Sequence, residues 1–172
     1  MLLRRLPALA RGWLGPRHHP LPTLAFPLRF WPTDLNLGGH MDNVRYLALM
    51  DMARGIFFAR TGLTRLMVKQ KFAMPIAASH VRYRRELLPM DRFELKTRIA
   101  YWDDKWFFIE QQMVRDEAVV TEALFKSIFL GRKSHLEPRR LLQTLRAEPI
   151  PQPSIPPDVR AWFDAEGRQR GG

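Results

Sequence analysis

The 172-residue sequence predicts an α+β fold in which one antiparallel sheet wraps around a long central helix. Residues 44–60 carry apolar side chains in nearly every direction around a helix of 3.6 residues per turn, so this helix needs cover on several sides. Four strand-like segments follow with no long helix between them, which favours antiparallel pairing. The length fits a single domain.

The first predicted strand covers residues 24–33, and Pro27 should place it at a sheet edge or a bulge because proline has no N–H for a ladder. A polar loop with paired glycines follows (DLNLGGHMDN), and Asp42 and Asn43 can cap the next helix. We expect that helix to end near Gly62, since glycine is common just past a C-terminus. A shorter helical piece is expected near 64–71.

The four later strands are predicted at 74–87, 92–101, 105–115 and 118–131. The segment 92–101 (RFELKTRIAY) alternates most clearly between apolar and charged residues, as a strand with one dry face does. One protomer of such a fold leaves a sheet edge and part of the helix uncovered, so we expect it to pair into a dimer. The hot-dog fold has this architecture.

We expect three segments: a basic tail over 1–23, the sheet-and-helix domain over 24–131, and a helical, proline-rich extension over 132–172 with helices near 136–145 and 158–166. The net charge is +11, and the first twenty residues hold four arginines and no acid. This tail is expected to be mobile and solvated, with an organelle transit peptide or a basic helix on a membrane surface as alternatives.

Several function classes lose support. Without cysteine the chain has no disulfide framework, thiolate nucleophile or cysteine-ligated zinc. Serine-hydrolase, phosphate-loop and zinc-protease motifs are absent, and we predict no metal, flavin or nicotinamide cofactor. No apolar run approaches the ~20 residues that span a bilayer. We therefore expect a cytoplasmic protein with at most weak membrane-surface contact through its basic N-terminus.

The residues that attract attention are His40 and its neighbours Asp34, Asn36, Asp42 and Asn43, which share one short loop before the helix. Backbone N–H groups and the positive end of the helix dipole can stabilise a developing oxyanion there. A nearby carboxylate can act as base or nucleophile. The alternative is purely structural: Gly38 and Gly39 form a tight turn, and the acid and amide that follow only cap the helix.

Residues 31–54 (WPTDLNLGGHMDNVRYLALMDMAR) resemble the hot-dog acyl-CoA thioesterases of the 4-hydroxybenzoyl-CoA type, whose loop and helix commonly read D-x-D-x-x-G-H-x-N-N-x-x-Y-L. The matching positions are Asp34, Gly39, His40, Asn43 and Tyr46. Residues 80–98 are similar to the strand-turn-strand that follows in that family. The resemblance implies metal-free hydrolysis of an acyl thioester of coenzyme A or acyl carrier protein by a dimer or tetramer. It also implies that Asn43 and Tyr46 bind substrate.

The sequence departs from that pattern at the chemically important position. In many members the second aspartate of the motif is the nucleophile or base, and Asn36 stands at that position here. Asp42 stands at a position where the motif usually has asparagine. We therefore predict that His40 polarises the carbonyl, Asn36 donates a hydrogen bond, and Asp34 or Asp51 activates water. Asp51 has an alternative role, a structural ion pair with Arg54 three residues later.

Arg82 and Arg84 alternate onto one strand face and are candidates for the phosphates of coenzyme A, although a solvated charged face would look the same. Two other functions stay open. A catalytically weak or silent hot-dog protein that binds acyl-CoA or a structural partner would explain Asn36. A nucleic-acid binder would explain only the sequence pI of about 11.0, and without an aromatic-basic signature we expect no nucleic-acid partner.

Overall fold

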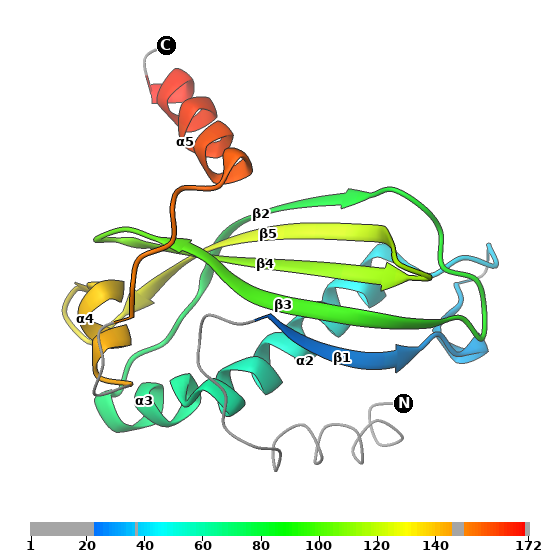
Figure 1. Ribbon diagram of the computed structural model, residues 1–172, viewed down its shortest axis with the longest axis horizontal. Coiled ribbons are helices and arrows are strands. Elements are labelled where there is room, and N and C mark those ends of the chain that lie inside the picture. The colour runs from blue at the N-terminus through cyan, green and yellow to red at the C-terminus, as the bar shows by residue number, and fades with distance from the viewer. Residues whose placement is uncertain (1–22, 37, 146–149, 171–172) are drawn as a thin grey trace.

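The computed structural model describes residues 23–36, 38–145 and 150–170, with side chains described as far as Glu166 in the last range. The strands are β1 (Leu24–Arg29), β2 (Ile76–Tyr83), β3 (Arg92–Trp102), β4 (Trp106–Arg115), β5 (Ala118–Leu130) and β6 (His135–Leu136). They form one sheet in the order β1-β3-β4-β5-β2, with β6 beside the end of β5, and every pairing is antiparallel (Figure 1). The predicted sheet is confirmed, including the edge position of Pro27 in β1.

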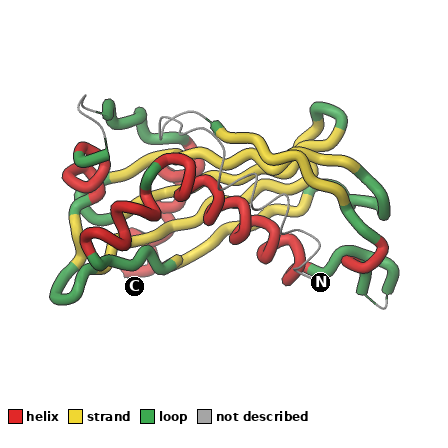
Figure 2. Tube along the Cα trace, turned by 90° about the horizontal axis from the view of Figure 1, so that it is seen from below, coloured by secondary structure: helices red, strands yellow, loops and turns green. Residues whose placement is uncertain are grey.

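The long helix is α2 (Asn43–Thr61), and α3 (Leu63–Gln70) follows it directly. The Asp42 side chain accepts a hydrogen bond from the Val44 backbone N at 3.3 Å and so caps α2. Gly62 ends the helix in the left-handed conformation, with φ of 86°. Figure 2 shows α2 lying across one face of the sheet.

The main core lies between α2 and that face of the sheet. Leu49, Met50, Ala53 and Phe57 recur at helical spacing and are at most 2% exposed. They belong to one apolar cluster with buried side chains of the central strands, namely Leu95, Ile99, Phe107, Ile109, Phe125 and Phe129. Each of these strands presents alternate residues to α2, so one face of the sheet packs against the helix as predicted.

The prediction that α2 is covered on several sides is correct only in part. Val44 is 71% exposed and Leu47 38% exposed, and the adjacent strand β2 has exposed or half-buried residues throughout. The helix is apolar on this flank as well, but among the described residues no element covers Val44 and Leu47. Among the described strands, only β5 pairs with β2, so its other edge has no partner.

The segment after residue 131 packs onto the sheet-and-helix domain. Helix α4 (Pro138–Gln143) places Leu141 and Leu142 in the main core. An extended stretch then crosses to the opposite sheet face, where the Gln152 Nε2 donates to the Trp102 carbonyl at 2.5 Å. The predicted proline-rich connection is thus extended but tied to the sheet.

Helix α5 (Pro157–Arg170) packs on the sheet face opposite α2 (Figure 1). Val159 is fully buried against Ala100, Phe108 and Leu124. Lys126 lies beneath this helix, 2% exposed, with its Nζ 2.5 Å from a Glu166 carboxylate oxygen and 3.9 Å from the centre of the Trp106 ring. A buried charge with an opposite charge and an aromatic face around it is well compensated, so α5 belongs to this sheet face.

No helix among the described residues combines the length and apolar character needed to cross a membrane. The basic tail predicted over 1–23 lies outside the described residues except for Thr23.

Candidate active site

The loop before α2 is organised by Asn36. Its side-chain oxygen accepts hydrogen bonds from the backbone N of Gly38 at 2.9 Å and of His40 at 3.1 Å. Its own backbone N donates to the His40 carbonyl at 2.8 Å, and Gly39 turns the chain with φ of 81°. The predicted tight turn and the Asp42 cap are therefore both present. Because the oxygen of Asn36 is engaged in the turn, the amide nitrogen is the group it can offer to a ligand.

This turn presents His40 next to an acid that the sequence analysis missed. The His40 Nδ1 is in hydrogen-bonding contact with a carboxylate oxygen of Glu86, and the two side chains are 64% and 44% exposed. A carboxylate that accepts from Nδ1–H fixes the ring and its tautomer, which leaves Nε2 as the proton acceptor. The pair is thus an imidazole base oriented by a carboxylate.

Tyr46 explains why Glu86 lies at this loop although 46 residues separate it from His40. The Tyr46 hydroxyl accepts a hydrogen bond from the backbone N of Leu87 at 3.5 Å, and Leu87 is fully buried. The Tyr46 ring also packs edge to face on Tyr83, with centroids 5.2 Å apart. Burial raises the pKa of Tyr46, so the hydroxyl stays protonated near neutral pH. The motif tyrosine, predicted to bind substrate, is 4% exposed, and its hydroxyl contacts the segment that carries Glu86.

Asp34 is not available in the way we predicted. It is 5% exposed, and one carboxylate oxygen accepts from the Trp31 backbone N at 3.2 Å. The other oxygen lies 3.6 Å from Nε of Arg45 on α2. These contacts tie the carboxylate to the short helical turn η2 (Pro32–Asp34) and to the first turns of α2. The carboxylate of Asp34 links two neighbouring segments of the chain, and the prediction that it activates water finds no support.

For Asp51 the structural ion pair with Arg54 is observed, and the prediction that its carboxylate activates water finds no support. The Asp51 side chain is 80% exposed and lies 2.8 Å from Arg54 Nη2. It lies eight residues beyond the start of α2, which is about 12 Å along the helix axis. The carboxylate is held by a cation and lies two turns beyond the first residue of α2.

Arg54, not Asp51, is the buried member of this pair, at 6% exposed. Its Nη1 donates to Gln111 Oε1 at 2.9 Å, and the guanidinium lies 4.1 Å from the centre of the Phe125 ring. Gln111 Nε2 in turn donates to the Met50 carbonyl at 3.0 Å and to Thr97 Oγ1 at 2.9 Å. Burial lowers the pKa of Arg54, and the charge of Asp51 opposes that shift. The only sequence signal for this network is a glutamine on the dry face of a strand.

Arg82 and Arg84 share one partner, as their predicted common face requires. Both reach the same carboxylate oxygen of Glu122, at 3.2 Å and 2.7 Å. One acid for two cations leaves a net positive charge at the end of β2, and both arginines are about half exposed. Asn43, the first residue of α2, is exposed.

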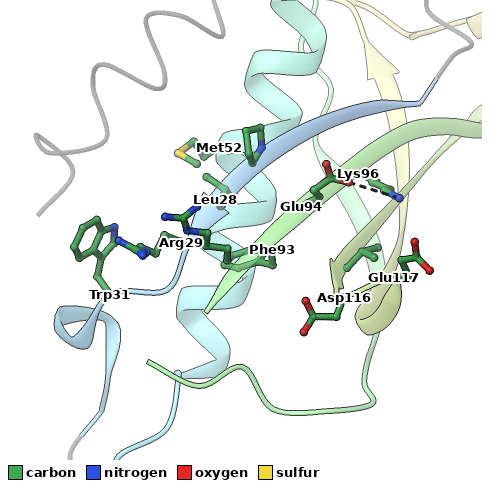
Figure 3. Close-up of a pocket in the computed structure, with 12 residues that line it drawn as sticks. Leu28, Arg29, Trp31, Met52, Phe93, Glu94, Lys96, Asp116 and Glu117 are labelled. Carbon is green, nitrogen blue, oxygen red and sulfur yellow. Dashed lines mark ion pairs between the residues drawn. The ribbon is translucent and has the colours of Figure 1, made fainter. Parts of the chain in front are cut away.

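Two cavities complete the picture. The larger, of about 590 Å³, lies along β1 and β3 and includes Trp31, Met52 and Phe93 (Figure 3). None of the predicted site residues lines it, and its charged residues are mixed in sign, with Glu94 and Lys96 paired at 3.7 Å. The smaller, of about 210 Å³, lies between α2 and the start of β2. Its lining residues are Asp51, Arg54, Gly55, Phe58, Met74 and Ile76. Within the described residues, no three histidine or acidic side chains gather as a metal site would need.

The chain resembles known proteins in sequence and in structure. It is 34% identical to Protein THEM6 of Xenopus laevis over 134 residues, which cover 77% of this chain and 63% of that protein. A Danio rerio Protein THEM6 is 33% identical over 132 residues, again 63% of its length, so the chain spans less than two thirds of these relatives.

Among solved structures, the YbaW probable thioesterase from Escherichia coli has a TM-score of 0.66 at 18% identity, covering 71% of this chain and 95% of that one. The 4-hydroxybenzoyl CoA thioesterase from Pseudomonas sp. strain CBS-3 has a TM-score of 0.63 at 17% identity, covering 72% and 99%. Likeness at this identity shows the shared hot-dog fold. Residues 30–163 match the Thioesterase-like superfamily as a family, a span that runs from β1's end through α4 into α5. On the strength of that match and of its fold, this chain belongs to the Thioesterase-like superfamily.

Proposed function

We propose that this protein hydrolyses an acyl thioester of coenzyme A to a free acid and a thiol. The observation that carries the proposal is the contact of His40 with Glu86 at the loop before α2, because it supplies an oriented base. The family and the structural neighbours named as thioesterases support thioester hydrolysis in general. The choice of coenzyme A rests on Arg82 and Arg84, exposed cations that can bind its phosphates. They lie at the C-terminal end of β2, a few residues before Glu86.

In the proposed reaction, Nε2 of His40 takes a proton from a water molecule as the water oxygen attacks the thioester carbon. The carbon–sulfur bond then breaks, and the proton passes from His40 to the departing thiolate. Glu86 stabilises the imidazolium that forms between these steps. Asp42 already places a carboxylate at the positive end of α2, so the oxyanion depends more on the amide nitrogen of Asn36.

An acyl-CoA hydrolysis assay tests this function. Wild-type protein is expected to release thiol from at least one member of a series running from acetyl-CoA to stearoyl-CoA with one aryl-CoA included. His40→Ala should lower kcat by about 10²- to 10⁴-fold because it removes the base. His135→Ala, exposed on the short strand β6 and away from the loop before α2, serves as the matched control and should keep the wild-type rate. Equal rates for wild type and His40→Ala would overturn the assignment.

A second function is favoured by one observation, the amide at position 36 where the family usually has a carboxylate. A protein that binds acyl-CoA without turning it over would show binding but no thiol release. Hydrolysis that appears only after Asn36→Asp would support this silent protein over the enzyme.

We also propose that two copies pair through the outer edge of β2. This edge has no partner among the described strands, and exposed apolar side chains flank it on α2 and β2, namely Val44, Leu47, Ile76 and Tyr83. Pairing would satisfy the edge and bury these side chains. Sedimentation equilibrium of the purified chain should give twice the monomer mass, and monomer at all micromolar concentrations would contradict the pairing.

A further inference from the structure

Gly55 lies in the middle of the central helix, where glycine is unfavourable. A glycine at an interior helix position costs about 1 kcal/mol relative to alanine. Close packing usually explains such a residue, but a Cβ added at Gly55 would meet no atom within 4 Å outside its own helix and its chain neighbours. The part of the chain that the structure describes therefore gives no steric reason for glycine here. The space in front of Gly55 is the 210 Å³ cavity.

The walls of this cavity suit an apolar guest. Phe58, Met74 and Ile76 supply aromatic and aliphatic surface, and methionine adapts readily to different shapes. Asp51 and Arg54 also line it, but they neutralise each other at 2.8 Å. For scale, an apolar cavity of about 150 Å³ binds benzene. The space thus accommodates the last several carbons of a chain.

Strand β2 and helix α2 lie side by side, and we call the line between them the seam. The cavity and the candidate active site lie at its opposite ends. Tyr83, at the end of β2, contacts Tyr46 near the start of α2. Ile76, at the start of β2, shares the cavity with Gly55, twelve residues further along α2 than Asn43. Strand β2 therefore runs antiparallel beside α2, and Val44 and Leu47 are exposed on the first turns of that helix. The helical rise puts the two ends about 18 Å apart.

We propose that the acyl chain of the substrate runs along this seam and places its methyl end in the cavity at Gly55. An extended chain advances about 1.2 Å per bond, so the 18 Å separation corresponds to about fifteen bonds, which is a linear acyl group of roughly fourteen to sixteen carbons. The inference rests on the proposed function for the position of the thioester, and it adds the substrate class: long, unbranched acyl groups.

The pairing proposed above would bring a second copy of the protein beside this flank of α2, so a second copy is the competing occupant of the cavity. Another copy would pair with the backbone N–H and C=O groups along the edge of β2. The cavity is a separate feature, and it is open because residue 55 has no side chain. Glycine lowers the stability of the helix and leaves the cavity open. A cavity that stays open suits an acyl chain that binds and dissociates better than a permanently bound second subunit.

Binding of S-alkyl-CoA thioethers, which cannot be hydrolysed, tests the inference independently of catalysis. With the wild-type protein, isothermal titration should show affinity rising about fourfold per added carbon up to about C14, as burial of each methylene predicts. Gly55→Leu fills the cavity and should weaken C14 binding at least tenfold while leaving C6 binding unchanged. Ala165→Leu, on the exposed side of α5, adds similar bulk elsewhere and should change neither.

Gly55→Ala distinguishes an effect on acyl-chain binding from an effect on the stability of the fold. It should raise the melting temperature, because nothing obstructs the added methyl group, and still weaken C14 binding about fourfold. Chain-length dependence that is identical in wild type and Gly55→Leu would overturn the inference, as would a loss of dimer in Gly55→Leu without any change in binding. Thiol release from acyl-CoA in that case would leave the proposed hydrolysis standing. Normal thioether binding without any hydrolysis would instead contradict the function and keep the inference.

Discussion

Glu86→Gln is expected to lower kcat for acyl-CoA hydrolysis by about 10²- to 10⁴-fold, the range over which general-base catalysis contributes. The glutamine keeps the size of the side chain but cannot stabilise the imidazolium at His40 or hold one tautomer through a carboxylate. Since Glu86 contacts the imidazole and not the thioester, KM should change little. The measurement is steady-state hydrolysis for wild type and variant, with kcat and KM determined separately.

Two further variants make this prediction specific. Glu122→Gln removes an acid that binds Arg82 and Arg84 near the same end of β2, and it should keep kcat within twofold. Adding Asn36→Asp to Glu86→Gln returns a carboxylate to the position where the family usually has it. If a carboxylate at position 36 can itself act as base, the double variant should recover at least tenfold over Glu86→Gln. Wild-type kcat in Glu86→Gln would show that the observed contact has no catalytic part.

Gln111→Leu should lower the free energy of unfolding by about 3 kcal/mol. The leucine fills a similar volume but leaves Arg54, the Met50 carbonyl and Thr97 each without the partner that the amide provides. Removing one partner from buried polar groups costs far more than an exposed hydrogen bond gains, particularly when one of them is a cation. Urea unfolding followed by circular dichroism measures the change.

Gln112 offers a control one residue away on the same strand. It points to the other face, is partly exposed, and its amide donates to Glu110 at 2.9 Å. Gln112→Leu is expected to change the unfolding free energy by less than about 0.5 kcal/mol. Equal destabilisation by the two variants would mean that the network under α2 contributes nothing beyond strand propensity.

Much of the fold was predictable because it depends on local patterns. The apolar run over 44–60, with Asp42 before it and Gly62 after it, contains its own start and stop signals, and α2 begins and ends within a residue of them. The alternation in 92–101 likewise gave β3. Strand β2 was predicted too long at its C-terminal end, because the chain bends after Tyr83 and the backbone N of Arg84 and of Arg85 both donate to the Val120 carbonyl.

Only the residues of the candidate site that belong to one contiguous motif could be predicted from the sequence. His40, Asn36 and the cap were found because they lie within a few residues of one another. Glu86 could not be found in this way, since only the packing of Tyr46 and Leu87 brings it to the loop. For Asp51 and Arg54, the spacing predicted an ion pair but not which of the two side chains faces inward. Gln111, which decides that question by accepting from Arg54, lies on a distant strand.

Helix α5 also restricts how this protein can assemble. By seating Val159 on Phe108 and Leu124, it occupies the back of the sheet with a segment of the same chain. Two such sheets cannot stack flat against each other there without first displacing that helix and exposing the charge of Lys126 to a new neighbour. Back-to-back stacking on this face is therefore blocked, and the proposed pairing through the edge of β2 would leave α5 in place.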